Sequence, residues 1–84
     1  MTRLWPEGTP IQVWSSSTNE PIQFHWQGRA HPVANIHKQW RVYLDWWRKQ
    51  LWRDYFKLTT QTGLLVIIYR DKQSNQWYLQ RLYD

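Results

Sequence analysis

The stretch that decides the fold is GLLVIIYRDKQSNQWYLQRLYD, residues 63–84. It contains two apolar and aromatic runs, at 64–69 and 77–83, on either side of a short polar segment. Runs of this length, rich in β-branched and aromatic residues, are typical of two antiparallel strands joined by a tight connection. We therefore expect a hairpin with strands at about 64–70 and 76–83.

The chain upstream of this hairpin carries further strand patterns. Residues 11–14 and 22–26 alternate between apolar and polar side chains, a third such segment begins near Ala30, and residues 53–60 precede a turn. Alternation of this kind indicates strands with one buried face. The sequence predicts a mainly β domain, with a five- to six-stranded antiparallel sheet that curls into a half-barrel or closes into a small barrel.

The length of 84 residues is that of one small domain. Residues 1–8, which include Pro6 and Gly8, are expected to form a flexible N-terminal arm. The single β-rich domain would then occupy residues 9–84.

Residues 38–58 allow two interpretations. Their large apolar side chains recur every three or four residues, which is the spacing of an amphipathic helix: Trp40, Leu44, Trp47, Leu51, Tyr55 and Leu58. The aromatic and β-branched residues at 55–60 favour a strand instead. We expect one short helical insertion within about 42–52, followed by a strand. The alternative is an α+β fold in which a helix near 40–57 packs on the sheet.

The composition excludes several classes of protein. Cysteine is absent, so disulfides and thiolate metal sites are impossible. The longest aliphatic run, residues 64–68, is far shorter than the ~20 residues that cross a bilayer. The N-terminus has no apolar segment of signal-peptide length. We expect a soluble cytoplasmic protein.

No catalytic or metal-binding pattern is present. The serines lie in turn-like contexts, the carboxylates are scattered, and three glycines form no phosphate-binding loop. His25, His31 and His37 are spaced by six residues without a carboxylate cluster beside them, so a zinc site is not expected. The sequence predicts a protein that is not an enzyme and that needs no cofactor or metal.

The best functional candidate is the segment 38–57, where aromatic rings alternate with cations. It holds six Lys or Arg against Asp45 and Asp54, so it carries +4 of the chain's net charge of +5. The candidate residues for binding nucleic acid or a partner are Lys38, Arg41, Trp46, Trp47, Arg48, Lys49, Trp52, Arg53 and Lys57.

Three interpretations of this segment stay open. Single-stranded nucleic acid binds cationic grooves in which bases stack on exposed aromatic rings. Trp, Tyr and Arg also dominate the hot spots of protein interfaces. Alternatively, the rings form the core and the cations lie in solvent. Outside the segment, Arg70 and Arg81 are expected to pair with the carboxylates of Asp71 and Asp84, with phosphate contact as the alternative.

Three stretches resemble a family of short bacterial domains of unknown function. The segment 24–29 (FHWQGR) resembles the opening of these domains, and Trp46-Trp47 followed by 53–56 (RDYF) resembles their middle. The hairpin at 63–84 resembles their closing motif. Such domains occur alone, or near or at the tail of the inactive Y-family polymerase homologue of the damage-inducible mutagenesis system. The family has no established catalytic residues, so no site is transferred from it.

The resemblance implies an accessory role in DNA repair or translesion synthesis. Together with the charge pattern, it leads us to expect a non-enzymatic module that contacts nucleic acid through a basic and aromatic surface. The alternative is a protein-interaction module that anchors a polymerase-like or recombinase-like partner, or a second copy of itself.

Overall fold

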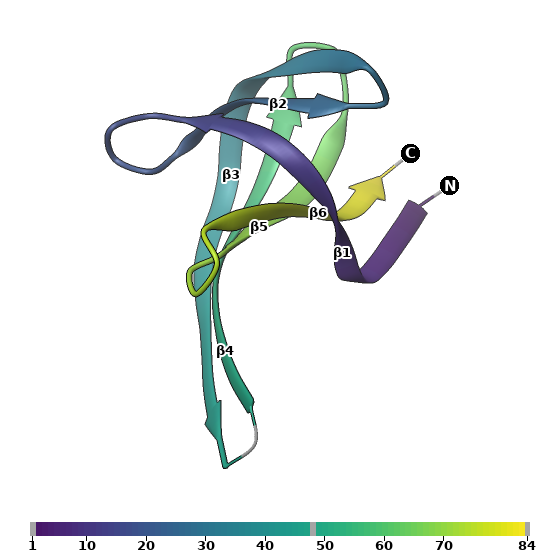
Figure 1. Cartoon of the computed structure of the whole chain (residues 1–84). Helices are drawn as coiled ribbons and strands as arrows, with labels where there is room; N and C mark the ends of the chain where they lie inside the picture. Colours follow the sequence, from purple (N-terminus) through teal and green to yellow (C-terminus); the bar gives the residue numbers. More distant parts are fainter. Residues whose placement is uncertain (1, 48, 84) are drawn as a thin grey trace.

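In the computed structural model, six strands follow one another in chain order and close into an antiparallel barrel (Figure 1). The structure describes residues 2–47 and 49–83; residues 2, 3, 6, 7, 46 and 49 are described by their backbone alone. The strands are β1 (Thr2–Ser15), β2 (Pro21–Trp26), β3 (Arg29–Trp46), β4 (Lys49–Thr60), β5 (Leu65–Asp71) and β6 (Gln76–Tyr83). The predicted mainly β fold is confirmed.

The C-terminal hairpin is present as predicted. β5 and β6 pair through Ile68 with Leu79 and through Tyr69 with Tyr78. In the turn between them, the backbone N–H of Asn75 donates to the Asp71 carbonyl oxygen over 2.7 Å. Asn75 adopts a positive φ of 59°, a conformation that Asn tolerates better than most residues. Local alternation and turn chemistry are therefore enough to predict this hairpin.

The core lies inside the barrel, on one face of each strand. Because successive residues of a strand point to opposite faces, each strand contributes every second side chain to the interior. The largest fully buried interior side chains come from β2, β4, β5 and β6: Phe24, Phe56, Leu58, Val66, Ile68 and Leu79. The residues between them form an outer surface, which carries the candidate site described below.

The predicted helical insertion is wrong. The residues expected to form it belong to β3 and β4, which pair from Val33 with Thr60 up to Trp46 with Lys49. In this register Leu44 lies opposite Leu51. Apolar residues four apart on one strand share a face, and the reversal of the chain brings the apolar residues of the next strand onto the same face. The helix-like spacing thus arises from two strands joined by a tight turn. The alternative α+β fold, with a helix near 40–57, is therefore also wrong.

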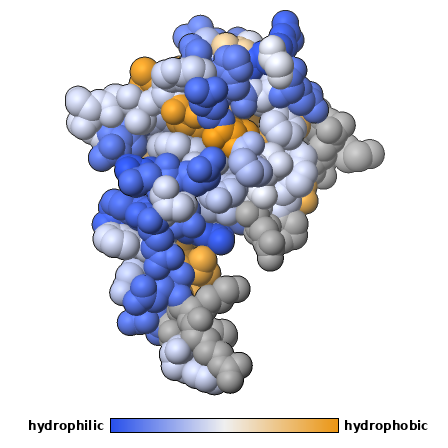
Figure 2. Space-filling model, viewed as in Figure 1, coloured by the Kyte–Doolittle hydropathy of each residue, from blue (hydrophilic) through white to orange (hydrophobic). Residues whose placement is uncertain are grey.

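The end of the β3–β4 pair projects beyond the barrel as a two-stranded ribbon (Figure 1). β5 pairs with β4 only from Arg53 onward, and β2 pairs with β3 only as far as Pro32. We call residues 40–52 the projecting hairpin. In the view of Figure 2, hydrophilic residues cover most of it, while the larger hydrophobic patch lies over the barrel.

The N-terminal segment takes part in closing the barrel. The backbone of Thr2, Arg3 and Leu4, which the sequence analysis assigned to an arm, pairs with Tyr83, Leu82 and Arg81 of β6. The register then shifts before Thr9, where pairing with β6 resumes. No helix with the length and apolar character needed to cross a membrane occurs in the described part of the chain.

Candidate nucleic-acid interface

A row of four aromatic rings crosses the outer surface of β3, β4, β5 and β6, one ring from each strand. Trp40 stacks on Tyr55 with ring centroids 5.2 Å apart and an angle of 7° between the planes. The centroids of Tyr55 and Tyr69, and of Tyr69 and Tyr78, are each 5.1 Å apart. The register explains the row, because Trp40, Tyr55, Tyr69 and Tyr78 are successive cross-strand neighbours. We call this surface of β3–β6 the outer face.

Cations from three strands lie over the rings of the outer face. The Arg53 guanidinium is 4.4 Å from the centroid of Tyr69, and the Lys38 ammonium is 5.4 Å from that of Trp40. Lys57 and Arg81 both approach the ring of Tyr83, at 5.3 and 5.6 Å. A cation within about 6 Å of a ring centroid is attracted by the negative face of the ring. The rings therefore hold the cations on this face in defined places.

Arg53 is the most constrained of these cations. Its Nη1 donates to the Tyr55 hydroxyl over 3.1 Å, while its Nε is buried without a hydrogen-bond partner among the described residues. The guanidinium lies instead over the face of the Tyr69 ring. Burial lowers the pKa of Arg53, but the hydrogen bond to Tyr55 and nearby charges raise it, and the net direction is upward. Arg53 is therefore a permanent positive charge.

Burial has the opposite consequence for the Tyr69 phenol. It raises the pKa of Tyr69 above its ordinary value of about 10, and the nearby Arg53 charge only partly opposes this. Unfolding exposes the phenol and restores the ordinary pKa. The stability that this group contributes is therefore complete below about pH 10 and is lost as the pH rises through the folded-state pKa.

We expect the free energy of unfolding to fall between about pH 9 and pH 11, and to fall less in a Tyr69→Phe variant. Urea unfolding followed by circular dichroism at the two pH values measures both changes. Tyr43→Phe, which removes the hydroxyl of a tyrosine that is 57% exposed, is the matched control and should behave as the parent. If the free energy of unfolding fell equally in the parent and in Tyr69→Phe, the Tyr69 phenol would not be the source of the pH dependence.

A shallow groove of about 480 Å³ opens on the outer face beside the aromatic row. It is lined by His37, Lys38, Lys57, Thr59 and Leu65. The pairing of β3 with β4 shifts register between Ile36 and Lys38, and the inserted His37 bonds the Thr59 hydroxyl through Nε2 at 3.1 Å. The groove thus combines two ammonium groups with an imidazole and a hydroxyl, which are donors suited to phosphate oxygens.

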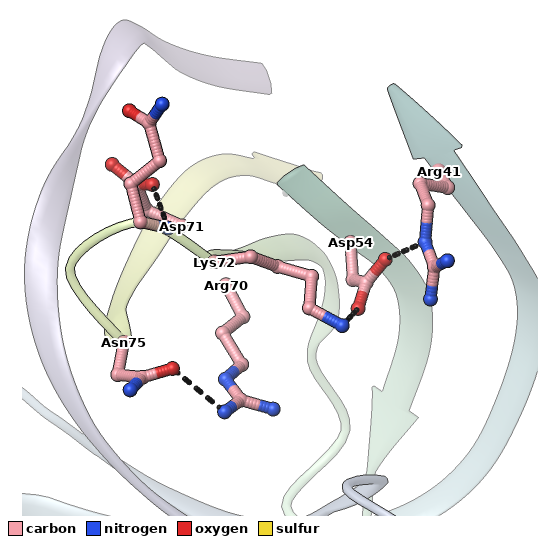
Figure 3. Close-up of polar contacts among 7 residues, drawn as sticks. Arg41, Asp54, Arg70, Asp71, Lys72 and Asn75 are labelled. Carbon is pink, nitrogen blue, oxygen red and sulfur yellow. Dashed lines mark hydrogen bonds and ion pairs between the residues drawn. The ribbon is translucent and has the colours of Figure 1, made fainter. Parts of the chain in front are cut away.

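The other face of β3 and β4 holds a separate polar cluster (Figure 3). The Asp54 carboxylate lies between Arg41, whose Nε is 2.7 Å away, and Lys72, whose Nζ is 3.5 Å away. Lys72 also lies over the Trp52 ring, 5.2 Å from its centroid. Asp54 is almost fully buried, so this cluster joins β3, β4 and the β5–β6 turn. The Asp54 carboxylate offsets one of the two cations, so the cluster keeps a net charge of +1.

The predicted binding residues therefore do not form one surface. Lys38, Arg53 and Lys57 lie together on the outer face, whereas Arg41 and Trp52 lie on the opposite face. Trp47 is at the end of the projecting hairpin and is 84% exposed. The remaining predicted residues lie outside what the structure describes, Arg48 entirely and two others in their side chains: Trp46 and Lys49.

The sequence analysis missed the part of the outer face that β5 and β6 supply. Tyr69 and Tyr83 belong to the C-terminal hairpin, for which the sequence predicts only the fold, whereas phosphate contact is one of the two predictions for Arg81. Tyr69 and Tyr78 pair directly across the hairpin, but Tyr83 reaches the same face only because the register shifts by one residue between Ile67 and Ile68, and alternation alone does not predict that shift. The expected pairing of Arg70 with a carboxylate is wrong within the described residues, because Arg70 donates to the Asn75 side-chain oxygen over 2.8 Å (Figure 3).

The histidines serve separate parts of the fold. His31 is buried, its Nδ1 is 2.7 Å from the Thr62 hydroxyl and its Nε2 is 3.3 Å from the Trp26 carbonyl oxygen. His25 packs against the Trp14 ring, with centroids 5.2 Å apart. Within residues 2–47 and 49–83, no three His, Asp or Glu side chains converge in a way that could hold a metal ion.

The fold and the outer face define a small antiparallel barrel with an ordered cationic and aromatic surface. The chain belongs to the family described as Domain of unknown function (DUF6504), whose model matches residues 7–84. Comparison with curated proteins and comparison with solved structures gave no significant match.

Proposed function

We propose that this domain is a non-enzymatic module that binds nucleic acid through the outer face. The observation that carries the proposal is the set of cations over rings: Lys38, Arg53, Lys57 and Arg81. Among the described residues, the acidic side chain on this face is that of Asp71, which lies opposite Arg53. The cations on this face therefore outnumber the carboxylates. A face with this charge balance attracts a phosphate backbone and releases its counterions.

The rings of the outer face divide into structural and contacting groups. Tyr55 and Tyr69 are 7% and 1% exposed, so they support the cations and cannot stack on a base. Trp40 and Tyr83 lie near the ends of the cluster and are half-buried. Both rings are partly exposed, and a base that stacked on either would have to be unpaired, which favours single-stranded nucleic acid over a duplex.

The biological setting that we propose is DNA repair or translesion synthesis in the bacterial cytoplasm. It is supported by the resemblance to domains that accompany an inactive polymerase homologue. An accessory module that holds single strands near a polymerase would need phosphate contacts and stacking but no catalytic group. The composition of the outer face meets both needs.

The test is the salt dependence of binding to a labelled single-stranded oligonucleotide, measured by fluorescence anisotropy. Lys38→Gln with Lys57→Gln removes two cations from the groove, so the slope of log affinity against log salt should fall by about 1.4, at about 0.7 per contact. Arg29→Gln with Lys72→Gln is the matched control, because it also takes the net charge from +5 to +3 but alters other parts of the surface.

The two double variants separate the possible outcomes. A reduced slope in the groove variant alone supports the proposed interface. An equal reduction in both variants would mean that overall charge, and not the outer face, drives binding. Failure of the parent protein to bind even at low salt would overturn the proposal.

A second candidate function is protein interaction through the projecting hairpin. Its large apolar side chains are unusually exposed: Tyr43 57%, Leu44 49% and Trp52 38%. Exposed apolar side chains that gather on one element mark interaction sites. This surface is distinct from the cationic groove, so the two functions are compatible.

A further inference from the structure

Much of β3 has an open strand edge. A strand in a barrel normally has a partner on each side, but β2 pairs with β3 only from Arg29 to Pro32. Beyond that point, the described residues provide β3 with one partner strand, β4, which follows it to Trp46. Figure 1 shows this part of β3 running along the outside of the projecting hairpin. An edge of this length is a template for a further strand.

The sequence of this edge is complementary to itself when two copies run antiparallel. Residues 40–46 read WRVYLDW, and Tyr43 is the centre. If Tyr43 lies opposite Tyr43 of a second copy, Arg41 lies opposite Asp45 and Val42 lies opposite Leu44. At the ends of the seven-residue segment, position 40 meets position 46, and both are Trp. The aromatic and aliphatic pairs each join residues of the same kind, and the charged pairs have opposite signs.

The two faces of this paired edge are also consistent. Arg41, Tyr43 and Asp45 share one face of β3, so that face would carry an aromatic pair flanked by two ion pairs. The even-numbered residues share the other face, which would be apolar. A shift of one residue in the register would place Arg41 opposite Leu44 and lose this match.

The charged residues are available for such contacts. The Arg41 side chain is 59% exposed, and its contact with Asp54 uses Nε, which leaves the terminal nitrogens of the guanidinium to donate elsewhere. The Asp54 contact also fixes the arginine in place. Asp45 is exposed, and among the described residues it accepts one long hydrogen bond of 3.4 Å, from Gln50.

We propose that this edge binds a second copy of the chain, with β3 antiparallel to β3 of the partner and Tyr43 at the two-fold axis. The product is a four-stranded sheet in the order β4, β3, partner β3, partner β4. The hairpin projects beyond its barrel (Figure 1), so an antiparallel pairing centred on Tyr43 places the two barrels at opposite ends of this sheet. The inference rests on the second candidate function. It shares Trp40 with the proposed nucleic-acid interface but uses neither cation of the groove, Lys38 or Lys57.

The first experiment is analytical ultracentrifugation of the whole chain over a range of concentrations. The parent should sediment as a dimer of the 10.5 kDa chain. Asp45→Lys places like charges opposite Arg41 at both symmetric positions, so the dimer Kd should rise at least about tenfold. Glu20→Lys makes the same charge change in the exposed turn before β2, away from the edge, and should leave the Kd unchanged.

The second experiment tests the register. The chain has no cysteine, so a single introduced thiol reports its own position. Under mild oxidation Tyr43→Cys should give a covalent dimer, because position 43 faces itself in the proposed pairing. Leu44→Cys should not, because two such positions would be diagonal neighbours about 7–8 Å apart.

A monomer at every concentration would overturn the inference while leaving nucleic-acid binding untouched. A dimer that is insensitive to Asp45→Lys, or that cross-links as well through position 44 as through position 43, would also overturn it. Loss of DNA binding with an intact dimer would instead count against the proposed function alone. Circular dichroism of each variant establishes that it is folded.

Discussion

Replacing Phe56 with alanine should lower the free energy of unfolding by about 3–5 kcal/mol and leave much of the protein unfolded. Phe56 is 1% exposed at the centre of the barrel, with its ring 5.6 Å from that of Trp77. Removing the ring loses its apolar burial and creates a cavity that the surrounding strands cannot fill. The loss is comparable with the whole stability of a small domain, which is often only about 5 kcal/mol.

Equilibrium unfolding in urea, followed by tryptophan fluorescence, measures this effect. Ile22→Ala is the control, because Ile22 is also a large apolar residue on a strand but is 52% exposed. Its substitution should cost about 0.5 kcal/mol or less. If both variants lose the same stability, the barrel interior is not the main source of the folding free energy.

Replacing Gly8 with alanine should be the most damaging change outside the core. Gly8 has a φ of 79°, and a Cβ built there would lie 2.7 Å from Cβ of Tyr78 and 2.9 Å from the Tyr69 hydroxyl oxygen. The backbone conformation alone costs about 1–2 kcal/mol for a non-glycine residue. The overlap adds about 1–3 kcal/mol, because Cβ of Tyr78 cannot move without its strand.

Gly28 provides the matched control for this prediction. Its φ is 75°, close to that of Gly8, but a Cβ there would meet nothing within 4 Å. Gly28→Ala should therefore show the conformational cost alone, and the difference in urea midpoint between the two variants isolates the overlap. Gly8→Ala should also weaken nucleic-acid binding, since it displaces one end of the aromatic row. Equal stability of the two variants would contradict the close approach of β1 to Tyr78.

The parts of the fold that the sequence predicted are those that depend on local pattern. The C-terminal hairpin has clean alternation and a polar turn, and its predicted strands differ from the observed ones by one residue at most. The segment 38–58 failed because Leu44 and Leu51 are neighbours across a turn, and their spacing along the chain imitates a helix. Only knowledge of the chain reversal distinguishes the two cases.

The candidate site could be predicted only where it depends on residues close together in the sequence. The excess of cations at 38–57 is visible in the sequence, and Lys38, Arg53 and Lys57 do share a face. Alternation, however, sends Arg41 to the opposite face, where it pairs with Asp54. The contributions of Tyr69 and Tyr83 come from strands that the linear pattern does not connect to this segment. Their proximity follows from the pairing of β4 with β5 and of β5 with β6.

The order of the strands has a consequence for how the barrel forms. Five of the six pairings join strands that follow each other in the chain, and only β1 with β6 joins its two ends, with Thr2 opposite Tyr83. Closing that pairing has the largest loop-closure entropy, so it should be the last and slowest step of folding. Until then the chain is an open sheet whose two outer strands have unpaired edges. The period during which the chain can join the wrong partner is therefore set by the rate at which its own ends meet.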